Sequence, residues 1–497
     1  MALTVDVLEE RQFGAALPLA LAAIALAPES PTPIYEQIER AIRSAIQQGD
    51  LPTGTLLPTS RELAQALGVG RNTVVAAYSR LTAEGFLISK FRRGTRVAQP
   101  PVGVSLAAAS PESPVREEPD DRASLAPGFQ AQRAFQRWNS HGAVAHPFSE
   151  ADPSLFPRAA LQRLLSDAFG RFEESGSLGD CRHFQEAVAA HFRQARGVVC
   201  VPEQVIPVSS SLACFDLVGR VLLDPGHATL VEDPAPRDVC SAFEAAGARV
   251  FSLPVDSAGA DPRAAKTPPP RLIYVSPSLN VPAGPQMTLE RRVALLEAAR
   301  AWDSAVLEWD GLSELLFAGS RIGALQGLDT EGRVLYCGSF ECTLGPHLTA
   351  AFLVVPENLG TTFMAAARSA GQVPHAFLLA AIAAYLESNQ YAMHVKRLRA
   401  AYARRVKLAA DALREALPHA VIVEPLGGLQ LTVALPPNID AGRAAQQARD
   451  CGFAAALFDR YSLARPAPNR LVLGLAGLPD RLVDVSSRRF AATLTRP

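Results

Sequence analysis

Apolar residues recur with a helical period near the start of the chain. Isoleucine occupies every fourth position from Ile34 to Ile46, which puts these side chains on one face of a predicted helix. A second run, with apolar residues at i, i+4 and i+7 from Val74, predicts another helix. We expect this helix to end at Gly85, where a left-handed cap needs no Cβ.

A shorter predicted helix lies between these two and is joined to the second by a tight turn. Thr59 and Glu62 stand at the spacing of a capping box, in which each side chain bonds the backbone of the other residue. Residues 68–70, which include two glycines, mark the turn. Two short strands, at residues 86–90 and 95–97, are expected to follow as a hairpin.

This order of helix, turn, helix and hairpin predicts a winged helix-turn-helix over residues 31–98, a module that reads double-stranded DNA. The start of the last helix should meet base edges in the major groove, and the hairpin, which is basic and has no acid, should contact phosphates. The residues that we predict to bind DNA are Arg61, Arg71, Asn72, Thr73, Lys90, Arg92, Arg93, Gly94 and Arg96. The alternative is that these side chains form an ordinary solvated face.

Two segments beside the predicted DNA-binding domain lack its pattern. Residues 1–30 form an N-terminal arm with an apolar run at 13–27, which is too short to span a bilayer. The run follows Glu9 and Glu10 rather than the basic residues of a signal peptide. Residues 99–140 are rich in proline, serine and alanine, which is typical of a linker. We therefore expect no membrane partner.

Short apolar runs alternate with helical patterns over much of residues 141–497. This rhythm predicts an α/β domain with a mainly parallel sheet and helices on both faces. Toward the C-terminus the pattern changes to long helices and then to strands around Gly427 and Gly428. We therefore expect a large lobe over about 158–385 and a small α+β lobe over about 386–497.

Composition adds two constraints on function. The chain of 497 residues has a formal net charge of −1, so attraction to DNA must come from the local basic patch rather than from the whole protein. Its seven cysteines are scattered and show no metal-ligand spacing, which is typical of reduced thiols in a cytoplasm. We predict a cytoplasmic protein and no metal site.

The predicted DNA-binding domain resembles the GntR family of transcriptional regulators, and specifically its MocR branch. The resemblance rests on residues 34–38, 54–64, 68–74 and 83–87. One departure from the family pattern is Gly70, where serine or threonine is usual, and glycine costs only roughly a few tenths of a kcal/mol as an N-cap. The other is the wing tip Arg92-Arg93-Gly94, where Gly-Ser-Gly is usual; the arginines should strengthen phosphate contacts.

The second region resembles a fold-type I aminotransferase, the domain that MocR regulators carry behind their winged helix. The motifs that match in order include residues 196–198, 224–226, 231–234, 276–278, 282–284 and 338–340. In that family a pocket between the lobes binds pyridoxal phosphate through a lysine imine, an acid at the ring nitrogen and donors at the phosphate. The resemblance also implies a homodimer whose two winged helices read two half-sites.

Most positions that hold this cofactor in the family are replaced here. Cys342 stands in place of the imine-forming lysine, and no lysine occurs in residues 267–395. Trp309 takes the place of the ring acid, Gly311 that of the ring tyrosine, and Thr349 that of the phosphate arginine. The degenerate pocket comprises Ser210, Ser211, Asn280, Trp309, Gly311, Ser339, Cys342 and Thr349, with Ser210 and Ser211 at the phosphate loop.

Three functions can be weighed on these residues. We interpret the chain as a sequence-specific transcriptional regulator whose aminotransferase-like domain has no catalytic residues, dimerises, and senses an unknown small-molecule effector without covalent pyridoxal phosphate. The alternative is a MocR-type regulator that still binds pyridoxal phosphate non-covalently, for which Asn280 remains competent. The third, an active transaminase, needs a lysine amine that the site lacks. Visible absorbance of the purified protein separates the first two.

Overall fold

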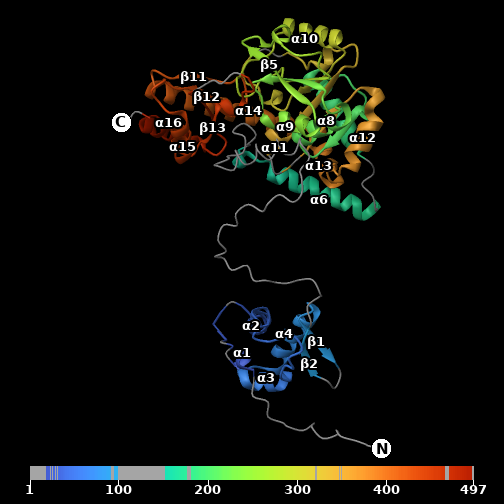
Figure 1. The fold of residues 1–497 in the computed structure, drawn as a ribbon, viewed down its shortest axis with the longest axis vertical. Coiled ribbons are helices and arrows are strands. Elements are labelled where there is room, and N and C mark those ends of the chain that lie inside the picture. Colours follow the sequence, from blue (N-terminus) through green and yellow to red (C-terminus); the bar gives the residue numbers. More distant parts are fainter. Residues whose placement is uncertain are drawn as a thin grey trace, which may run out of the picture. The chain divides into compact units, whose positions relative to one another are not determined.

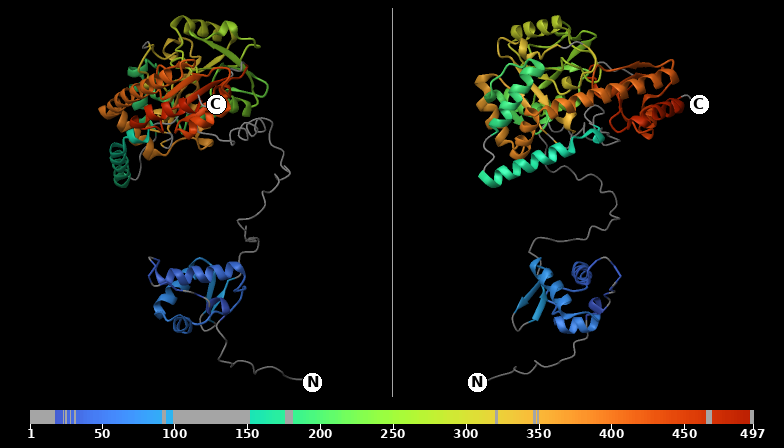
Figure 2. Two further views of the ribbon diagram at one scale, coloured as in Figure 1. Left: turned by 90° about the vertical axis from the view of Figure 1, so that its left-hand side faces the viewer. Right: turned by 180° about the vertical axis from the view of Figure 1, so that it is seen from behind.

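The computed structural model divides into two compact units, Met1–Arg122 and Ala123–Pro497, and each has its own hydrophobic core (Figures 1 and 2). The described residues are 18–22, 24, 26–27, 29–30, 32–90, 94–98, 152–175, 181–319, 322–345, 348, 350–464 and 469–494. The predicted linker at 99–140 lies outside the described residues, as does most of the arm at 1–30.

The described residues of the first unit form four helices and a hairpin. Their bounds are α1 Leu19–Ala22, α2 Ile34–Gln48, α3 Ser60–Leu67, α4 Arg71–Ala83, β1 Leu87–Lys90 and β2 Gly94–Val97. The predicted isoleucine face is confirmed, since Ile38 and Ile42 are fully buried. Leu21 of α1 is buried in the same core, so part of the apolar run at 13–27 packs as a short helix.

Local signals in the sequence explain how these helices begin and end. The capping box at Thr59 and Glu62 is present at the start of α3. Gly49 and Gly68 follow α2 and α3 with φ of 85° and 66°, the left-handed region that glycine enters without a Cβ penalty. Gly85 has φ of 81° just after α4, as the sequence predicted. The helices and the hairpin together form a winged helix-turn-helix.

A sheet of eight strands, in the order β3-β10-β9-β8-β7-β4-β5-β6, forms the centre of the second unit. The strands are β3 Val205–Val208, β4 Ala228–Asp233, β5 Arg249–Asp256, β6 Gly259–Ala260, β7 Leu272–Val275, β8 Ala305–Trp309, β9 Val334–Ser339 and β10 Ala351–Val354. Strands β9, β8, β7, β4 and β5 are parallel neighbours, whereas β10 runs antiparallel to β3 and β9. The predicted mainly parallel sheet is therefore confirmed.

Helices cover this sheet and lead into a smaller C-terminal lobe (Figures 1 and 2). The helices around the sheet are α6 Arg158–Ser175, α7 Arg182–Arg196, α8 Ser211–Leu222, α9 Arg237–Ala245, α10 Leu289–Trp302, α11 Glu341–Leu344, α12 Gly360–Ser369 and α13 Ala376–Glu387. The long α14 (Asn389–Ala416) precedes the small lobe. No helix in the described part of the chain is long and apolar enough to cross a membrane.

The small lobe has an antiparallel sheet in the order β11-β12-β14-β13. Its strands and helices are β11 Val421–Val423, β12 Gln430–Ala434, α15 Ala441–Asp450, β13 Ala454–Leu457, β14 Arg470–Gly474 and α16 Asp480–Leu494.

In the large sheet, β3, β8 and β9 run in the same direction, so their C-terminal ends lie on the same side of the sheet. Side chains that follow these three strands can therefore meet. Open α/β sheets bind their ligands at these C-terminal strand ends.

Candidate functional site

The start of α4 is an exposed polar surface. Arg71 and Asn72 are exposed and Thr73 is half-buried, while Gly70 caps the helix without a side-chain hydrogen bond. The Arg71 Nε lies 3.5 Å from the Ser60 Oγ, at the outer limit of a hydrogen bond. The Arg71 guanidinium therefore keeps nearly all its donors for a ligand. This is the arrangement that a recognition helix needs in a DNA groove.

The start of α3 is a less favourable phosphate site than the sequence suggested. Arg61 is exposed there, but the capping box already occupies the helix N-terminus. The Glu62 carboxylate accepts hydrogen bonds from the Thr59 backbone N–H at 2.8 Å and from the Thr59 hydroxyl at 2.9 Å. These bonds lower the pKa of the Glu62 carboxyl, which therefore stays ionised. A phosphate near this turn would meet the Glu62 carboxylate as well as the Arg61 guanidinium.

Two predicted contact residues of the wing, Gly94 and Arg96, also have structural roles. Gly94 has φ of 78°, and a Cβ there would lie 2.8 Å from the Leu56 Cδ1. Arg96 is exposed and donates from Nη1 to the Gly54 carbonyl at 3.0 Å, so it also ties the wing to the preceding loop. Arg92, Arg93 and the side chain of Lys90 lie outside the described residues.

Trp309 and Gly311 are a matched pair at the end of β8. The Trp309 side chain is only 8% exposed and its indole Nε1 donates to the Ser211 Oγ at 3.2 Å. A Cβ on Gly311 would lie 2.6 Å from the Trp309 Cζ2. A side chain at position 311 would therefore clash with the indole. In this structure the tryptophan at 309 requires a glycine at 311.

Ser210, Ser211 and Ser339 form a group of donors and acceptors where β3 meets α8 and where β9 ends. The Ser210 Oγ caps α8 by accepting from the Ala213 N–H at 3.0 Å. The Ser211 backbone N–H and hydroxyl donate to the Glu341 Oε2 at 3.1 and 2.8 Å. The Ser339 hydroxyl donates to the same oxygen at 2.8 Å. The carboxylate of Glu341 therefore lies in the loop that the resemblance assigns to the cofactor phosphate.

Sequence reasoning did not include Glu341 among the site residues. The available signal was its position directly before Cys342, where the aligned family motif Gly-Thr-Phe-Ser-Lys has serine. A carboxylate in place of a hydroxyl adds both length and charge at a phosphate loop. Only the structure shows that this carboxylate folds back onto Ser211, which is 130 residues away in the sequence.

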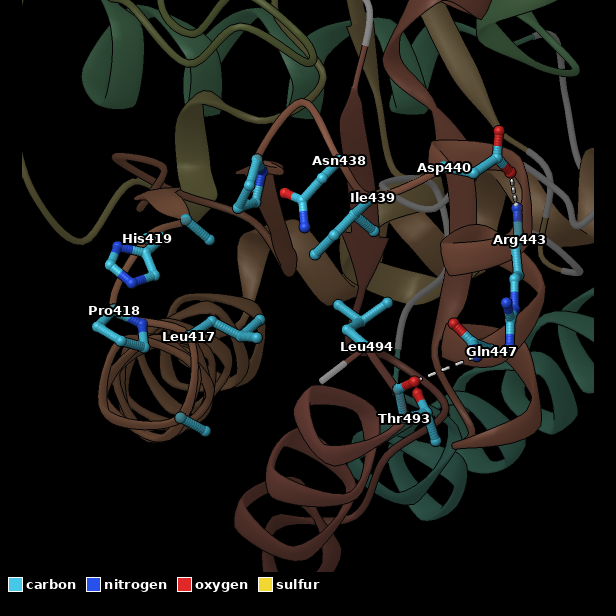
Figure 3. A pocket seen from close by; sticks show the side chains of 13 residues that line it. Leu417, Pro418, His419, Asn438, Ile439, Asp440, Arg443, Gln447, Thr493 and Leu494 are labelled. Atoms are coloured by element: carbon cyan, nitrogen blue, oxygen red, sulfur yellow. Dashed lines mark hydrogen bonds between the residues drawn. The ribbon is translucent and has the colours of Figure 1, made fainter. Parts of the chain in front are cut away.

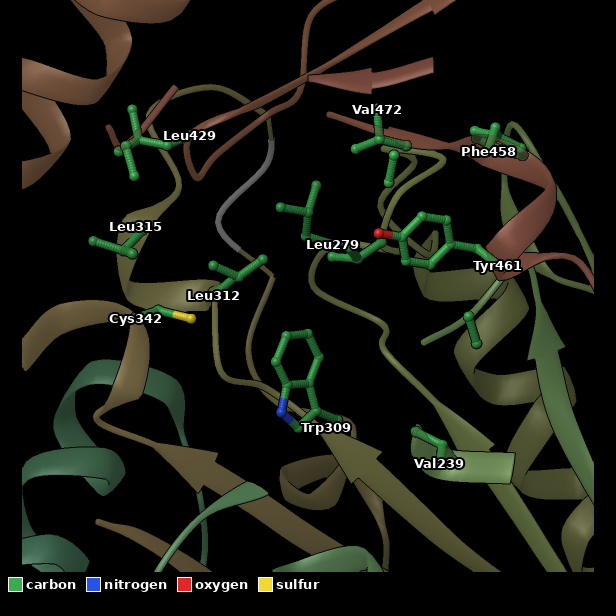
Figure 4. Close-up of a cluster of buried hydrophobic side chains, with 14 of the residues drawn as sticks. Val239, Leu279, Trp309, Leu312, Leu315, Cys342, Leu429, Phe458, Tyr461 and Val472 are labelled. Atoms are coloured by element: carbon green, nitrogen blue, oxygen red, sulfur yellow. The ribbon is translucent and has the colours of Figure 1, made fainter. Parts of the chain in front are cut away.

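Cys342 follows Glu341 in α11 and is buried in an apolar cluster with Trp309, Leu312 and Leu315 (Figure 4). Burial raises the pKa of its thiol to about 12, and the nearby Glu341 carboxylate adds to the shift. The thiol is therefore protonated at neutral pH, and a protonated thiol is a poor nucleophile. Cys342 packs as a small apolar side chain.

Asn280 is committed to a neighbouring carboxylate. Its Nδ2 donates to the Glu232 Oε2 at 2.8 Å and to the Pro234 carbonyl at 3.1 Å. Burial raises the pKa of the Glu232 carboxyl, while hydrogen bonds from Ser276 and Asn280 act against this shift. The Asn280 Oδ1 is buried without a partner among the described residues. The amide donors of Asn280 are thus already used, and Thr349 lies outside the described residues.

Two cavities open elsewhere on the second unit. One, of about 650 Å³, lies in the small lobe and has walls of mixed character, in which His419, Asn438 and Arg443 stand among apolar side chains (Figure 3). The other, of about 370 Å³, is lined by Arg196 and Glu314 among others. None of the described candidate pocket residues lines either cavity. Within the described residues, no group of three metal-ligating side chains is present.

Comparison with known proteins agrees with this two-part organisation. Residues 34–97 match the bacterial regulatory proteins of the gntR family, and residues 148–485 match aminotransferase class I and II. The probable rhizopine catabolism regulatory protein MocR of Rhizobium meliloti is 32% identical over 93% of this chain and 94% of its own length. The HTH-type regulator YhdI of Bacillus subtilis, described as uncharacterized, is 29% identical over 93% of this chain and 96% of its own.

A solved structure extends the likeness to three dimensions. Kynurenine aminotransferase of Pyrococcus horikoshii superposes with a TM-score of 0.63 at 22% identity, covering 76% of this chain and 96% of that one. At this identity the likeness establishes the aminotransferase fold of the second unit and nothing about its chemistry.

Proposed function

We propose, since this chain belongs to the MocR branch of the gntR family of regulators, that it controls transcription by reading specific duplex DNA through residues 31–98. The observation that carries this proposal is the start of α4, where Arg71 and Asn72 are exposed directly after a tight turn. With α4 in the major groove, an Arg71 guanidinium can bond guanine bidentately and an Asn72 amide can bond adenine.

Removing the Arg71 side chain tests the placement of the recognition helix. Arg71→Ala should weaken binding to a selected operator by about 1–3 kcal/mol, on the order of 5- to 150-fold in Kd, and relax the preference at one base pair. Fluorescence anisotropy with an operator selected from random duplexes measures this. An unchanged operator affinity would place the recognition helix elsewhere.

Two further variants make the test specific. Arg80→Ala is the matched control, because Arg80 is an exposed arginine of the same helix that pairs with Glu36 and Glu39 of α2. We expect it to leave operator affinity unchanged.

Replacing Arg92 and Arg93 together should weaken binding to all DNA sequences and flatten the salt dependence of binding, since phosphate contacts release counterions.

We further propose that the second unit is no transaminase and holds no covalent pyridoxal phosphate. This proposal is supported by Cys342, which is buried and stands where the resemblance leads us to expect the imine-forming lysine. Lys266, Lys396 and Lys407, the lysines of this unit, are all exposed. The residues present therefore do not fit a covalently bound cofactor, and the unit is left with the roles of sensing a small-molecule effector and of dimerisation.

A cytoplasmic homodimer completes the proposal. Apolar side chains that a monomer leaves in water support it: Phe169 and Phe172 of α6 are 51% and 43% exposed and contact Phe377 of α13. Two winged helices could then read two half-sites. Light scattering at micromolar concentration, with and without DNA, should give the mass of two chains. A single-chain mass under both conditions would contradict dimerisation.

A further inference from the structure

The Glu341 carboxylate has the hydrogen-bond partners of a bound ligand rather than of a surface side chain. Three donors converge on its Oε2, the Ser211 backbone N–H, the Ser211 hydroxyl and the Ser339 hydroxyl. They come from two elements, the first turn of α8 and the end of β9. Hydrogen bonds to an ionised acceptor are about twice as strong as neutral ones. The group of donors, here called the oxyanion cradle, is thus matched to a negative charge.

Trp309 fixes the direction of one of these donors. The Ser211 hydroxyl accepts from the Trp309 indole Nε1 at 3.2 Å and donates to Glu341 at 2.8 Å. Because a hydroxyl has one proton, accepting from the indole leaves that proton for the carboxylate. Trp309 and Glu341, which replace family residues at opposite ends of the cofactor site, are therefore joined through Ser211. One hydrogen-bond network, from Trp309 through Ser211 to Glu341, thus fills both ends of the site.

Charge favours the same arrangement. The Ser211 N–H belongs to the first turn of α8, and an anion near a helix N-terminus is stabilised by about 0.3–1 kcal/mol. The chain supplies that anion itself. A phosphate entering the cradle would have to displace Glu341 or sit beside its negative charge, and at van der Waals contact two like charges repel strongly.

We propose that Glu341 is the built-in occupant of the oxyanion cradle and closes this pocket to phosphate groups. The inference rests on the proposed loss of the cofactor, and it adds that the site excludes ligands with a phosphate group. An effector that enters the pocket must lack a phosphate at this end. Removing the carboxylate should uncover an oxyanion site that the wild-type chain does not offer.

Inorganic phosphate and tryptophan fluorescence can test this directly. Trp138→Phe and Trp302→Phe together leave Trp309, which contacts Ser211, as the only tryptophan. In this background Glu341→Ser should bind phosphate saturably at millimolar concentration, at least about tenfold more tightly than the Glu341 chain, because charge-assisted bonds become available to the ligand. The chain with Glu341 should show no saturable response.

Three controls interpret the result. Glu357→Ser removes an exposed glutamate that follows the end of β10 away from Ser339, and it should not create phosphate binding. Adding Ser211→Ala to Glu341→Ser should abolish the new binding, and a persisting response would place the phosphate elsewhere and overturn the inference. Glu341→Gln, which keeps the side-chain size, is the second variant in case Glu341→Ser does not fold, and it should bind phosphate more tightly than the chain with Glu341.

The outcomes separate the two proposals. Equal phosphate binding with and without the Glu341 carboxylate would overturn the closed cradle, whatever the cofactor does. An imine between the wild-type chain and pyridoxal phosphate would instead overturn the proposed function. If the Glu341→Ser and Glu341→Gln variants both fold and neither binds phosphate, the donors near Ser211 have only a structural role and the closed cradle is overturned.

Discussion

Asp310→Ala is expected to destabilise the aminotransferase-like unit by about 3–5 kcal/mol, because it leaves a buried guanidinium without its counter-ion. The Arg196 Nε lies 2.9 Å from the Asp310 Oδ2, and both residues are buried. The same oxygen accepts from the Tyr336 hydroxyl at 2.7 Å. Removing the carboxylate strands both donors in the interior. The midpoint of urea unfolding, followed by circular dichroism, measures the loss.

A surface pair of the same chemistry provides the control. Asp411 lies 3.1 Å from Lys407 on α14, and both side chains are more than half exposed. Asp411→Ala should cost no more than about 1 kcal/mol, since exposed ion pairs contribute little. If the Asp310 and Asp411 variants lost similar amounts of unfolding free energy, the buried Arg196–Asp310 pair would not be an important structural bond.

The Arg196–Asp310 pair is a structural bond next to the predicted pocket. Asp310 lies between Trp309 and Gly311, two positions at which the sequence predicts replaced cofactor residues, and it bonds α7 through Arg196. The buried pair can therefore hold this part of the fold together whatever the neighbouring side chains bind.

The elements of the fold could be predicted because their signals are local. Strand β7 (Leu272–Val275) is a continuous apolar run, and the capping box at Thr59 needs only a neighbour three residues away. The order of the sheet, with β10 antiparallel between β3 and β9, has no such local signal. It depends on how segments far apart in the chain pair.

The pocket could be predicted only as a set of replaced positions. The resemblance indicated Trp309, Gly311 and Cys342 one at a time, because each stands where the family motif leads us to expect a cofactor-binding residue. It did not identify the bond from Ser211 to Glu341 or the contact that excludes a Cβ at Gly311. Such contacts depend on rotamers and strand register, which a single sequence does not fix. Roles that depend on Thr349, Arg92 and Arg93 stay predictions from the sequence.

Cys342→Lys alone is expected to restore no imine with pyridoxal phosphate, although it returns the amine that the family uses. Glu341 already accepts from the three donors of the oxyanion cradle, so the cofactor phosphate cannot bind them without displacing its carboxylate. Trp309 fills the ring end and bonds Ser211 rather than a ring nitrogen. Each forgone charge-assisted bond is worth roughly 1.5–3 kcal/mol. The measurement is visible absorbance, followed by borohydride reduction and peptide mapping.

The same measurement on the wild-type chain carries the larger consequence. We expect no adduct within the pocket, because its thiol cannot form an imine and the lysines of this unit are exposed elsewhere. Peptide mapping is the control, since excess aldehyde can label exposed amines such as Lys266 or Lys396. Adding Glu341→Ser and Trp309→Asp to Cys342→Lys reopens both ends of the site and should be the first combination to give a reducible adduct at position 342. An adduct there with Cys342→Lys alone would show that Glu341 and Trp309 do not exclude the cofactor, and the pocket would then be open in the wild-type chain and lack only its amine.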